Sequence, residues 1–182
     1  MILKIGWKQE SMKRTINIIV SWLLVACVIT MTFYFSSQNA TKSENVSNTI
    51  IDGTIGGINN GQVLDKLEQK YTRDLLSVFI RNLGHLFEYA LLGFFMYNAV
   101  FITFKKKKIF TFIICIISFI FIGSLDEFIQ SFSDRNGNFI DVCIDIAGGI
   151  IGSVGMMIFY YFIKLVKDAF YKNNKIKLII YK

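Results

Sequence analysis

The chain has 182 residues, of which 53% are hydrophobic and 18 are Phe, and its mean hydropathy is +0.49. A soluble domain is about 45–50% apolar even when glycine is counted, so this composition excludes an ordinary soluble domain and indicates a membrane protein. The length permits a single domain. The net charge of +7 fits either nucleic-acid binding or a membrane topology, and the placement of the charges along the chain decides between them.

The first 35 residues predict a basic tail followed by a membrane span. Residues 1–14 contain three Lys and one Arg, and we expect them to form a cytoplasmic tail. Residues 15–35 carry no charge and have the length of about 17–25 residues that a helix needs to cross a bilayer. Their apolar run is longer than the roughly 7–15 residues of a signal peptide, so we expect an anchor that is not cleaved.

Residues 36–82 form the largest segment without the character of a span. The first part is rich in Ser, Thr, Asn and Gly and predicts an extracytoplasmic loop. In the second part, apolar residues recur at steps of three and four from Leu64 to Phe79, which predicts a short amphipathic helix leading into the next span. A connecting role fits this helix better than partner binding.

Three further windows have the length and apolarity of a membrane span, at residues 83–104, 109–125 and 142–163. Polar segments follow them in turn, as a cytoplasmic loop at 105–108, an extracytoplasmic turn at 126–141 and a cytoplasmic tail at 164–182. Backbone groups find no water inside a bilayer, so helices are the form expected for such windows. The predicted fold is therefore all-α, an integral membrane bundle of four transmembrane helices.

The basic residues predict which way the bundle crosses the membrane. They gather before the first span, between the second and third, and after the fourth. With four spans, these three segments lie on the same side, which is the positive-inside pattern for a multi-pass protein with both termini in the cytoplasm. The basicity is thus a topology signal, and the lipid bilayer rather than nucleic acid is the expected partner.

Polar residues of three spans are predicted to meet at one depth, near the outer surface. The second span starts there with Arg81, His85 and Glu88, which share one helix stripe. The third span ends there at the "DEFIQ" segment, which carries Asp126, Glu127 and Gln130. The fourth begins there with Asp141, and Asp145 lies one turn deeper. A charge at membrane depth costs about 2.5–3.5 kcal/mol, so this convergence predicts a shared polar pocket.

Glycines continue the acidic stripe of the fourth span. Gly148 and Gly152 lie on the same helix face as Asp141 and Asp145, in the spacing G-x-x-x-G. Small residues at this spacing let two helices approach closely. We therefore expect this face to pack against a neighbouring helix.

These segments resemble the VanZ-like family of bacterial membrane proteins. The family pattern pairs H-x-x-E-Y with E-x-x-Q, then an arginine-containing turn, an aspartate and G-x-x-x-G, and here it matches "HLFEYALLGF" and "DEFIQSFSDRNGNFIDVCIDIAGGIIG". "FYFSSQNATKSENVS" resembles its S-S-Q element, so the resemblance covers most of residues 33–155. Two positions depart from the pattern: Ser133-Asp134 replaces the usual Pro-Gly, and Asp145 stands where many members have Asn.

The resemblance implies a protein of the bacterial cell membrane that gives low-level resistance to teicoplanin, by acting on or recognising cell-envelope components. An envelope precursor or a glycopeptide is the expected partner. Adding the matched Tyr89 and Arg135 gives one ligand-binding set: Arg81, His85, Glu88, Tyr89, Asp126, Glu127, Gln130, Arg135, Asp141 and Asp145.

Two alternatives remain beside recognition. The polar groups could serve only to hold the bundle together, through pairs such as Arg135 with Asp141 or Arg81 with Glu88. The chain could instead be a membrane-embedded, metal-assisted hydrolase or transferase acting on a lipid-linked head group, although no nucleophile motif is present. Its catalytic candidates are His85, Glu88, Glu127 and Asp141. A divalent metal of the zinc or manganese type would take ligands from His85, Glu127, Asp141 and Asp145, with Glu88 and Asp126 as further carboxylates. The oligomeric state stays open.

Overall fold

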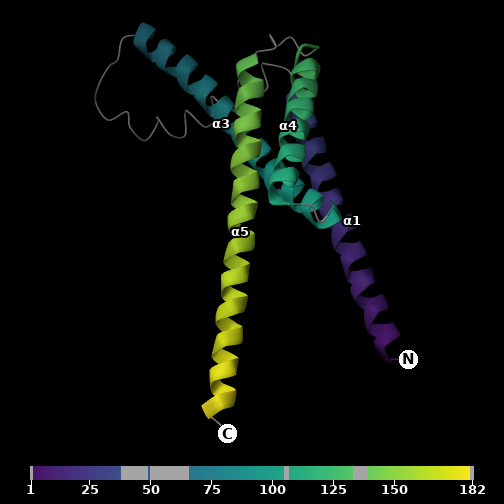
Figure 1. Cartoon of the computed structure of the whole chain (residues 1–182). Coiled ribbons are helices and arrows are strands. Elements are labelled where there is room, and N and C mark those ends of the chain that lie inside the picture. The colour runs from purple at the N-terminus through teal and green to yellow at the C-terminus, as the bar shows by residue number, and fades with distance from the viewer. Residues whose placement is uncertain (1, 38–48, 50–65, 105–106, 133–138, 181–182) are drawn as a thin grey trace.

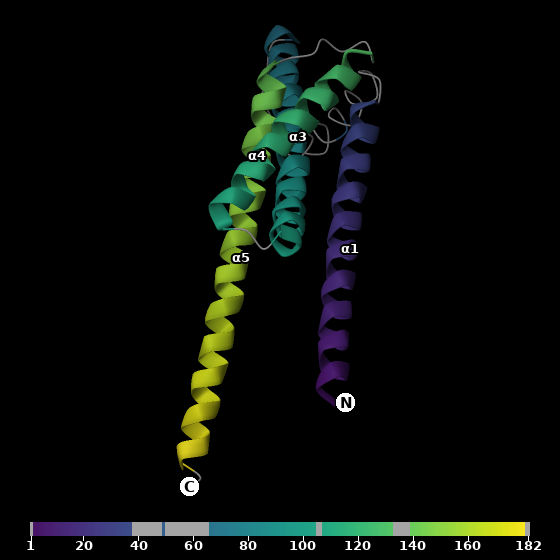
Figure 2. The ribbon, with the colours of Figure 1, turned by 45° about the vertical axis from the view of Figure 1, so that its right-hand side comes forward.

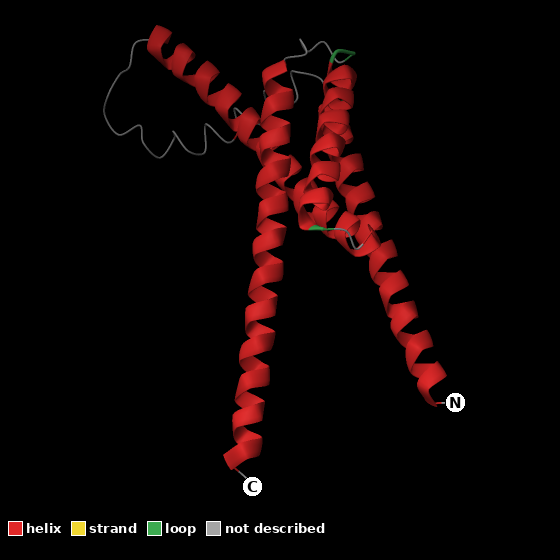
Figure 3. Ribbon diagram, in the orientation of Figure 1, coloured by secondary structure: helices red, strands yellow, loops and turns green. Residues whose placement is uncertain are grey.

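The computed structural model describes residues 2–37, 49, 66–104, 107–132 and 139–180, with side chains for 10–37, 49, 75–104, 107–132 and 139–171. Four long helices follow one another along the described chain (Figure 1), namely α1 (Ile2–Ser36), α3 (Lys66–Phe104), α4 (Lys108–Gln130) and α5 (Phe139–Ile180). Figure 3 shows that the described part is helical, with short loops and no strand. The sequence contains no proline, and proline is the residue that most strongly interrupts a helix interior.

Each of these helices contains a stretch long and apolar enough to cross a membrane. In the described part of the chain there are four such stretches: Glu10–Ser36, Leu75–Phe104, Lys108–Gln130 and Phe139–Tyr171. Large apolar side chains such as Phe87, Phe121 and Phe162 are mostly exposed on the bundle, where they suit contact with lipid. The prediction of an all-α chain with four long apolar helices is confirmed, and the chain is a multi-pass membrane protein.

The first residues of α1 and the last residues of α5 lie at the same end of the bundle. In Figures 1 and 2, α1 and α5 both extend beyond the junction between α3 and α4, toward the ends marked N and C. Four crossings return a chain to the side from which it started. The arrangement therefore agrees with two termini on one side of the membrane.

The amphipathic helix expected before the second span is described only in part. Its first residues lie in 50–65, outside the described residues, and from Lys66 the chain is helical without a break to Phe104. The side chains of 66–74 also lie outside the described ones, so the amphipathic face stays a prediction. In Figure 1, these first turns of α3 point away from the other helices.

The closest helix contact joins α3 and α5, and glycines make it. A Cβ atom at Gly152 would overlap the carbonyl oxygen of Ala90, and one at Gly148 would lie 2.5 Å from that of Leu86. Gly93 of α3 contacts the Gly149 backbone in the same way. Backbone thus packs on backbone, which is the geometry that small residues permit between membrane helices.

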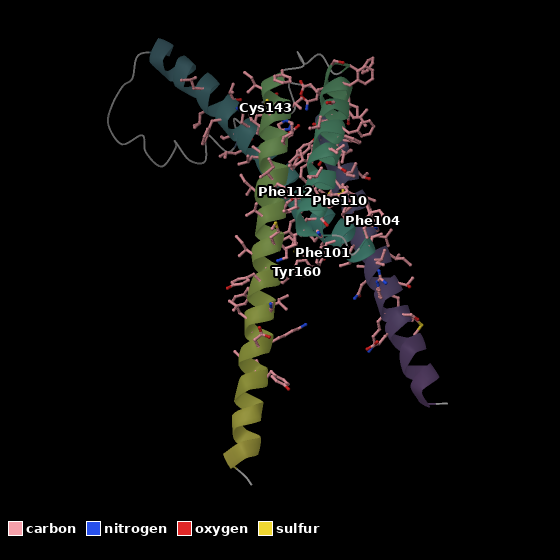
Figure 4. All side chains as sticks on the ribbon, viewed as in Figure 1. Phe101, Phe104, Phe110, Phe112, Cys143 and Tyr160 are labelled. Atoms are coloured by element: carbon pink, nitrogen blue, oxygen red, sulfur yellow. The ribbon has the colours of Figure 1, made fainter. Side chains whose placement is uncertain are left out.

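Neutral hydrogen bonds tie α1, α3 and α5 together toward the end where the termini lie. Asn98 Nδ2 donates to Ser21 Oγ at 2.9 Å, and the Tyr160 hydroxyl donates to Asn98 Oδ1. Trp22 Nε1 donates to Thr103 Oγ1 at 3.0 Å. Figure 4 shows Phe101 beside Tyr160, with ring centroids 5.2 Å apart. We call Ser21, Asn98 and Tyr160 the neutral polar cluster.

Candidate functional site

The predicted polar residues gather at the other end of the bundle. There α1 ends at Ser36, α4 ends at Gln130 and α5 begins at Phe139. Cys143, labelled in Figure 4, marks this end of α5, far along the helix from Tyr160. The site is therefore built where three helices start or stop, and α3 passes through the same level.

Three ionisable side chains from three helices form the centre of the site. His85 of α3, Asp126 of α4 and Asp145 of α5 are all buried, with Asp126 0% and Asp145 1% exposed. One nitrogen or oxygen from each lies within 4.8 Å of the others. His85 Nδ1 is 3.3 Å from Asp145 Oδ1. We call these residues the His–Asp–Asp cluster.

Gln130 orients Asp126 and links it to the end of α1. Gln130 Nε2, one turn further along α4, donates to Asp126 Oδ2 at 3.1 Å and to Ser36 Oγ at 3.3 Å. The end of α1 is thereby connected to the end of α4. Asp126 Oδ1 has no hydrogen-bond partner among the described residues, so one lone-pair face of this carboxylate remains available for a ligand.

An ion pair lies beside the cluster. Arg81 Nη2 donates to Asp141 Oδ2 at 2.8 Å, and the Arg81 side chain is 35% exposed whereas that of Asp141 is 4% exposed. The pair joins α3 to the first turn of α5. Arg81 thus pairs across the helix interface, and the alternative of pairing along its own helix with Glu88 is wrong.

Glycines bring the carboxylates into position. The approach of Gly148 to the backbone of α3 draws α5 toward that helix, so that Asp145 reaches His85. On the other side, a Cβ at Gly123 of α4 would lie 3.5 Å from Asp145 Oδ2. The carboxylate therefore sits between α3 and a glycine surface of α4.

The other predicted site residues take different positions. Tyr89, one turn after His85, is fully buried next to Asp145. Glu88 and Glu127 are half-buried, and Glu88 lies within electrostatic range of the His–Asp–Asp cluster. Among the described residues, Glu127 and Asp141 are not members of the cluster of potential metal ligands. Arg135 lies outside the described residues.

Ser36 is a site residue that the sequence reasoning did not select. It is buried and accepts the hydrogen bond from Gln130. The signal was present in the Ser-Ser-Gln element after the first span, but a serine at a helix end is common and carries no chemistry of its own. Gly123, which gives room to Asp145, had no signal beyond being a glycine in an apolar helix.

The donor set of the His–Asp–Asp cluster fits a divalent cation. One imidazole nitrogen and two carboxylate oxygens are ligands that zinc and manganese accept. The same groups could bind a ligand by hydrogen bonds, because the buried oxygens of Asp145 and Asp126 Oδ1 lack hydrogen-bond partners among the described residues. The arrangement can thus hold a polar or charged group at the end of an otherwise apolar bundle.

Comparison with known proteins gives one family. A family model described as VanZ/LLP1 matches residues 21–160, which run from α1 through most of the membrane part of α5. No curated protein and no solved structure matched the chain.

Proposed function

The chain belongs to the VanZ/LLP1 family, and from this premise we propose that it binds a polar cell-envelope component at the outer surface of a bacterial membrane. In this proposal, the His–Asp–Asp cluster and the Arg81–Asp141 pair form the binding site. Binding there contributes low-level resistance to teicoplanin. The ligand is an envelope precursor or the glycopeptide itself.

One observation carries the proposal: three buried ionisable groups from three helices meet at one end of the bundle. A polar contact between membrane helices contributes only about 0.6 kcal/mol on average. A charged residue at membrane depth costs about 2.5–3.5 kcal/mol. Holding helices together is therefore a weak reason to bury three such groups.

The neutral polar cluster supplies an internal comparison. Ser21, Asn98 and Tyr160 already join α1, α3 and α5 without an acidic or basic side chain. The bundle can therefore connect its helices without the free-energy cost of placing charged groups at membrane depth. The contrast between the two ends supports a binding role for the charged end.

The basic segments support the outer location of the site. The site lies at the end of the bundle away from the termini, and Lys residues crowd the tails and the link between α3 and α4. By the positive-inside rule these segments face the cytoplasm. The site then faces the envelope, where teicoplanin and envelope precursors are found.

The test is drug susceptibility in a teicoplanin-sensitive bacterium that expresses the full chain. We expect the wild-type chain to raise the minimal inhibitory concentration of teicoplanin. His85→Ala and Asp145→Ala should lose this increase, because each removes a buried ionisable group of the site. Asn98→Ala is the matched control, since it removes a half-buried polar side chain from the neutral polar cluster and should keep the increase.

Membrane abundance of every variant is measured in the same cells. If His85→Ala and Asp145→Ala reach wild-type abundance and still give wild-type resistance, the site is structural and the proposal is wrong. If the wild-type chain itself leaves teicoplanin susceptibility unchanged, the resistance role is wrong.

A further inference from the structure

We infer that the His–Asp–Asp cluster is a binding site for one divalent cation of the zinc or manganese class. The inference deepens the proposed function, because it names what the centre of that site holds. It rests on the charge balance of the cluster, its geometry and a buried hydroxyl beside it.

The charge balance favours a cation. Asp126 and Asp145 are two buried carboxyl groups, and His85 is the one basic group within the cluster. The guanidinium group of Arg81, which lies beside the cluster, pairs with Asp141. Buried charges in proteins are normally paired or coordinate a metal. A divalent ion bound to a neutral imidazole and two carboxylates balances the cluster completely.

The geometry of the histidine and aspartate also favours shared ligation. His85 Nδ1 and Asp145 Oδ1 are 3.3 Å apart, close enough for an ion pair when the imidazole is protonated, yet the two atoms do not meet the geometry of a hydrogen bond. Two ligands bound to one tetrahedral zinc at about 2.0–2.2 Å lie roughly 3.4 Å from each other. The observed separation thus matches the edge of a metal site, and a small adjustment of Asp126 completes it from within 4.8 Å.

Tyr89 is an independent sign of a ligand at this position. Its side chain is fully buried, next to Asp145 and one helical turn from His85. Its hydroxyl lies within reach of Asp145 but forms no hydrogen bond of good geometry with a described residue, although a buried phenol normally forms one. In a loaded site, the hydroxyl would donate to a carboxylate oxygen or to an oxygen bound at the metal, as outer-shell groups of metal sites do.

The donor types set the class of ion. One nitrogen and two oxygens exclude the soft sites that are built from thiolates, and Cys143, the cysteine closest in sequence to Asp145, is exposed. Three protein ligands also leave at least one coordination position open, as in catalytic zinc sites. An oxygen atom of an envelope head group could occupy that position, which connects the ion to the proposed function.

The test is metal binding by the purified full-length protein in detergent. The protein is stripped with a chelator, incubated with ZnCl2 or MnCl2, desalted and analysed for metal content. We expect about one ion per wild-type chain and loss of that ion in His85→Ala and Asp126→Asn. Asp168→Asn is the matched control: it makes the same change at an exposed aspartate of α5, outside the site, and should retain the ion.

Two further measurements guard against unfolded variants. Helical content is checked by circular dichroism, and the unfolding midpoint of the wild-type chain is followed as ZnCl2 is added. Because an ion that binds only the folded state stabilises it, we expect the wild-type midpoint to rise and the midpoint of Asp126→Asn to stay constant. A wild-type chain that retains no zinc or manganese, or variants that retain as much as Asp168→Asn, would overturn the inference.

The experiments distinguish a failure of the metal site from a failure of the proposed function. A wild-type chain that binds the ion but gives no teicoplanin resistance supports the metal site and contradicts the proposed function. A chain whose resistance depends on His85 and Asp145 but that binds no ion does the reverse.

Discussion

Arg81 and Asp141 share an ion pair in which the two partners have different access to solvent. Arg81 is about one-third exposed, whereas the carboxylate of Asp141 is almost completely buried. Removing the arginine leaves a buried carboxylate without its cation. Removing the aspartate leaves a long side chain that can extend its charge toward the membrane surface.

We therefore predict that Arg81→Ala destabilises the protein more than Asp141→Asn. A buried pair broken on one side costs about 3–5 kcal/mol, and the partial exposure of Arg81 reduces this to roughly 1–3 kcal/mol. The measurement is the free energy of unfolding in mixed detergent micelles. The double variant Arg81→Ala/Asp141→Asn should recover part of the loss, and equal effects of the two single changes would contradict the asymmetry.

For single residues, the sequence predicts how deep each site residue lies in the membrane. It does not predict which side chains of other helices each one contacts. His85 and Asp145 were expected at a common level because each lies near the same end of its span. Asp126 and Glu127 follow each other in the chain, so hydropathy places both at that level. Only the packing of α4 against α5 decides that Asp126 faces His85 and Asp145. Arg81 was assigned to the site, but its partner depends on the same packing.

Among the helices, the contact between α3 and α5 has the least free space. Gly148 and Gly152 face carbonyl groups of α3, whereas Gly155, on the same helix, has only the Phe94 ring at 3.9 Å from an added Cβ. The G-x-x-x-G spacing predicted a close approach from the sequence. It did not reveal the partner surface, because a single glycine such as Gly93 has no periodic signal.

This difference gives a matched pair of substitutions. Gly152→Ala should lower the free energy of unfolding by about 1–3 kcal/mol, because the added methyl overlaps the Ala90 carbonyl and forces α3 and α5 apart. Gly155→Ala meets only ordinary van der Waals contact and should be neutral or slightly stabilising, since alanine favours helix by about 1 kcal/mol over glycine. Reversible unfolding in detergent measures both. Equal effects of the two changes would show that α3 and α5 are not in backbone contact.

The four membrane helices could be predicted from the length of the apolar windows. The residues at which the helices begin and end could not. Residues 83–104 were predicted as the second span, with an amphipathic helix leading into it, and α3 joins the two segments in one helix from Lys66 to Phe104. A helix continues past its apolar window as long as nothing breaks it, and this sequence has no proline. The ends of α5 lie beyond residues 142–163 for the same reason.

For the whole molecule, topology is the property on which the proposed function depends. The ends marked N and C lie at one end of the bundle in Figures 1 and 2. The charged site lies at the other end, where α1 and α4 end and α5 begins. By the positive-inside rule, the basic segments predict that the terminal end faces the cytoplasm. The site can bind an envelope component only if this assignment is right.

We predict that a fluorescent protein fused after Lys182 is fluorescent in living cells, and that alkaline phosphatase fused there is inactive. Alkaline phosphatase inserted after Asn60, between the first two spans, should be active, because this segment is expected outside the cytoplasm. Enzyme activity and fluorescence are normalised to the amount of fusion protein. An active phosphatase at Lys182 would invert the bundle and place the site inside the cell.

The meeting of three helices at the His–Asp–Asp cluster has a consequence for how the protein is made. His85 leaves the ribosome with the second span and Asp126 with the third, whereas Asp141 and Asp145 arrive only with the last. Until α5 inserts, Arg81 lacks Asp141, and the carbonyl groups of Leu86 and Ala90 lack the close contact with the α5 glycines. Nascent chains that end before residue 139 therefore keep polar groups at membrane depth without their partners. We therefore expect such chains to be degraded faster than the full chain, and insertion of α5 to be the step that completes the site.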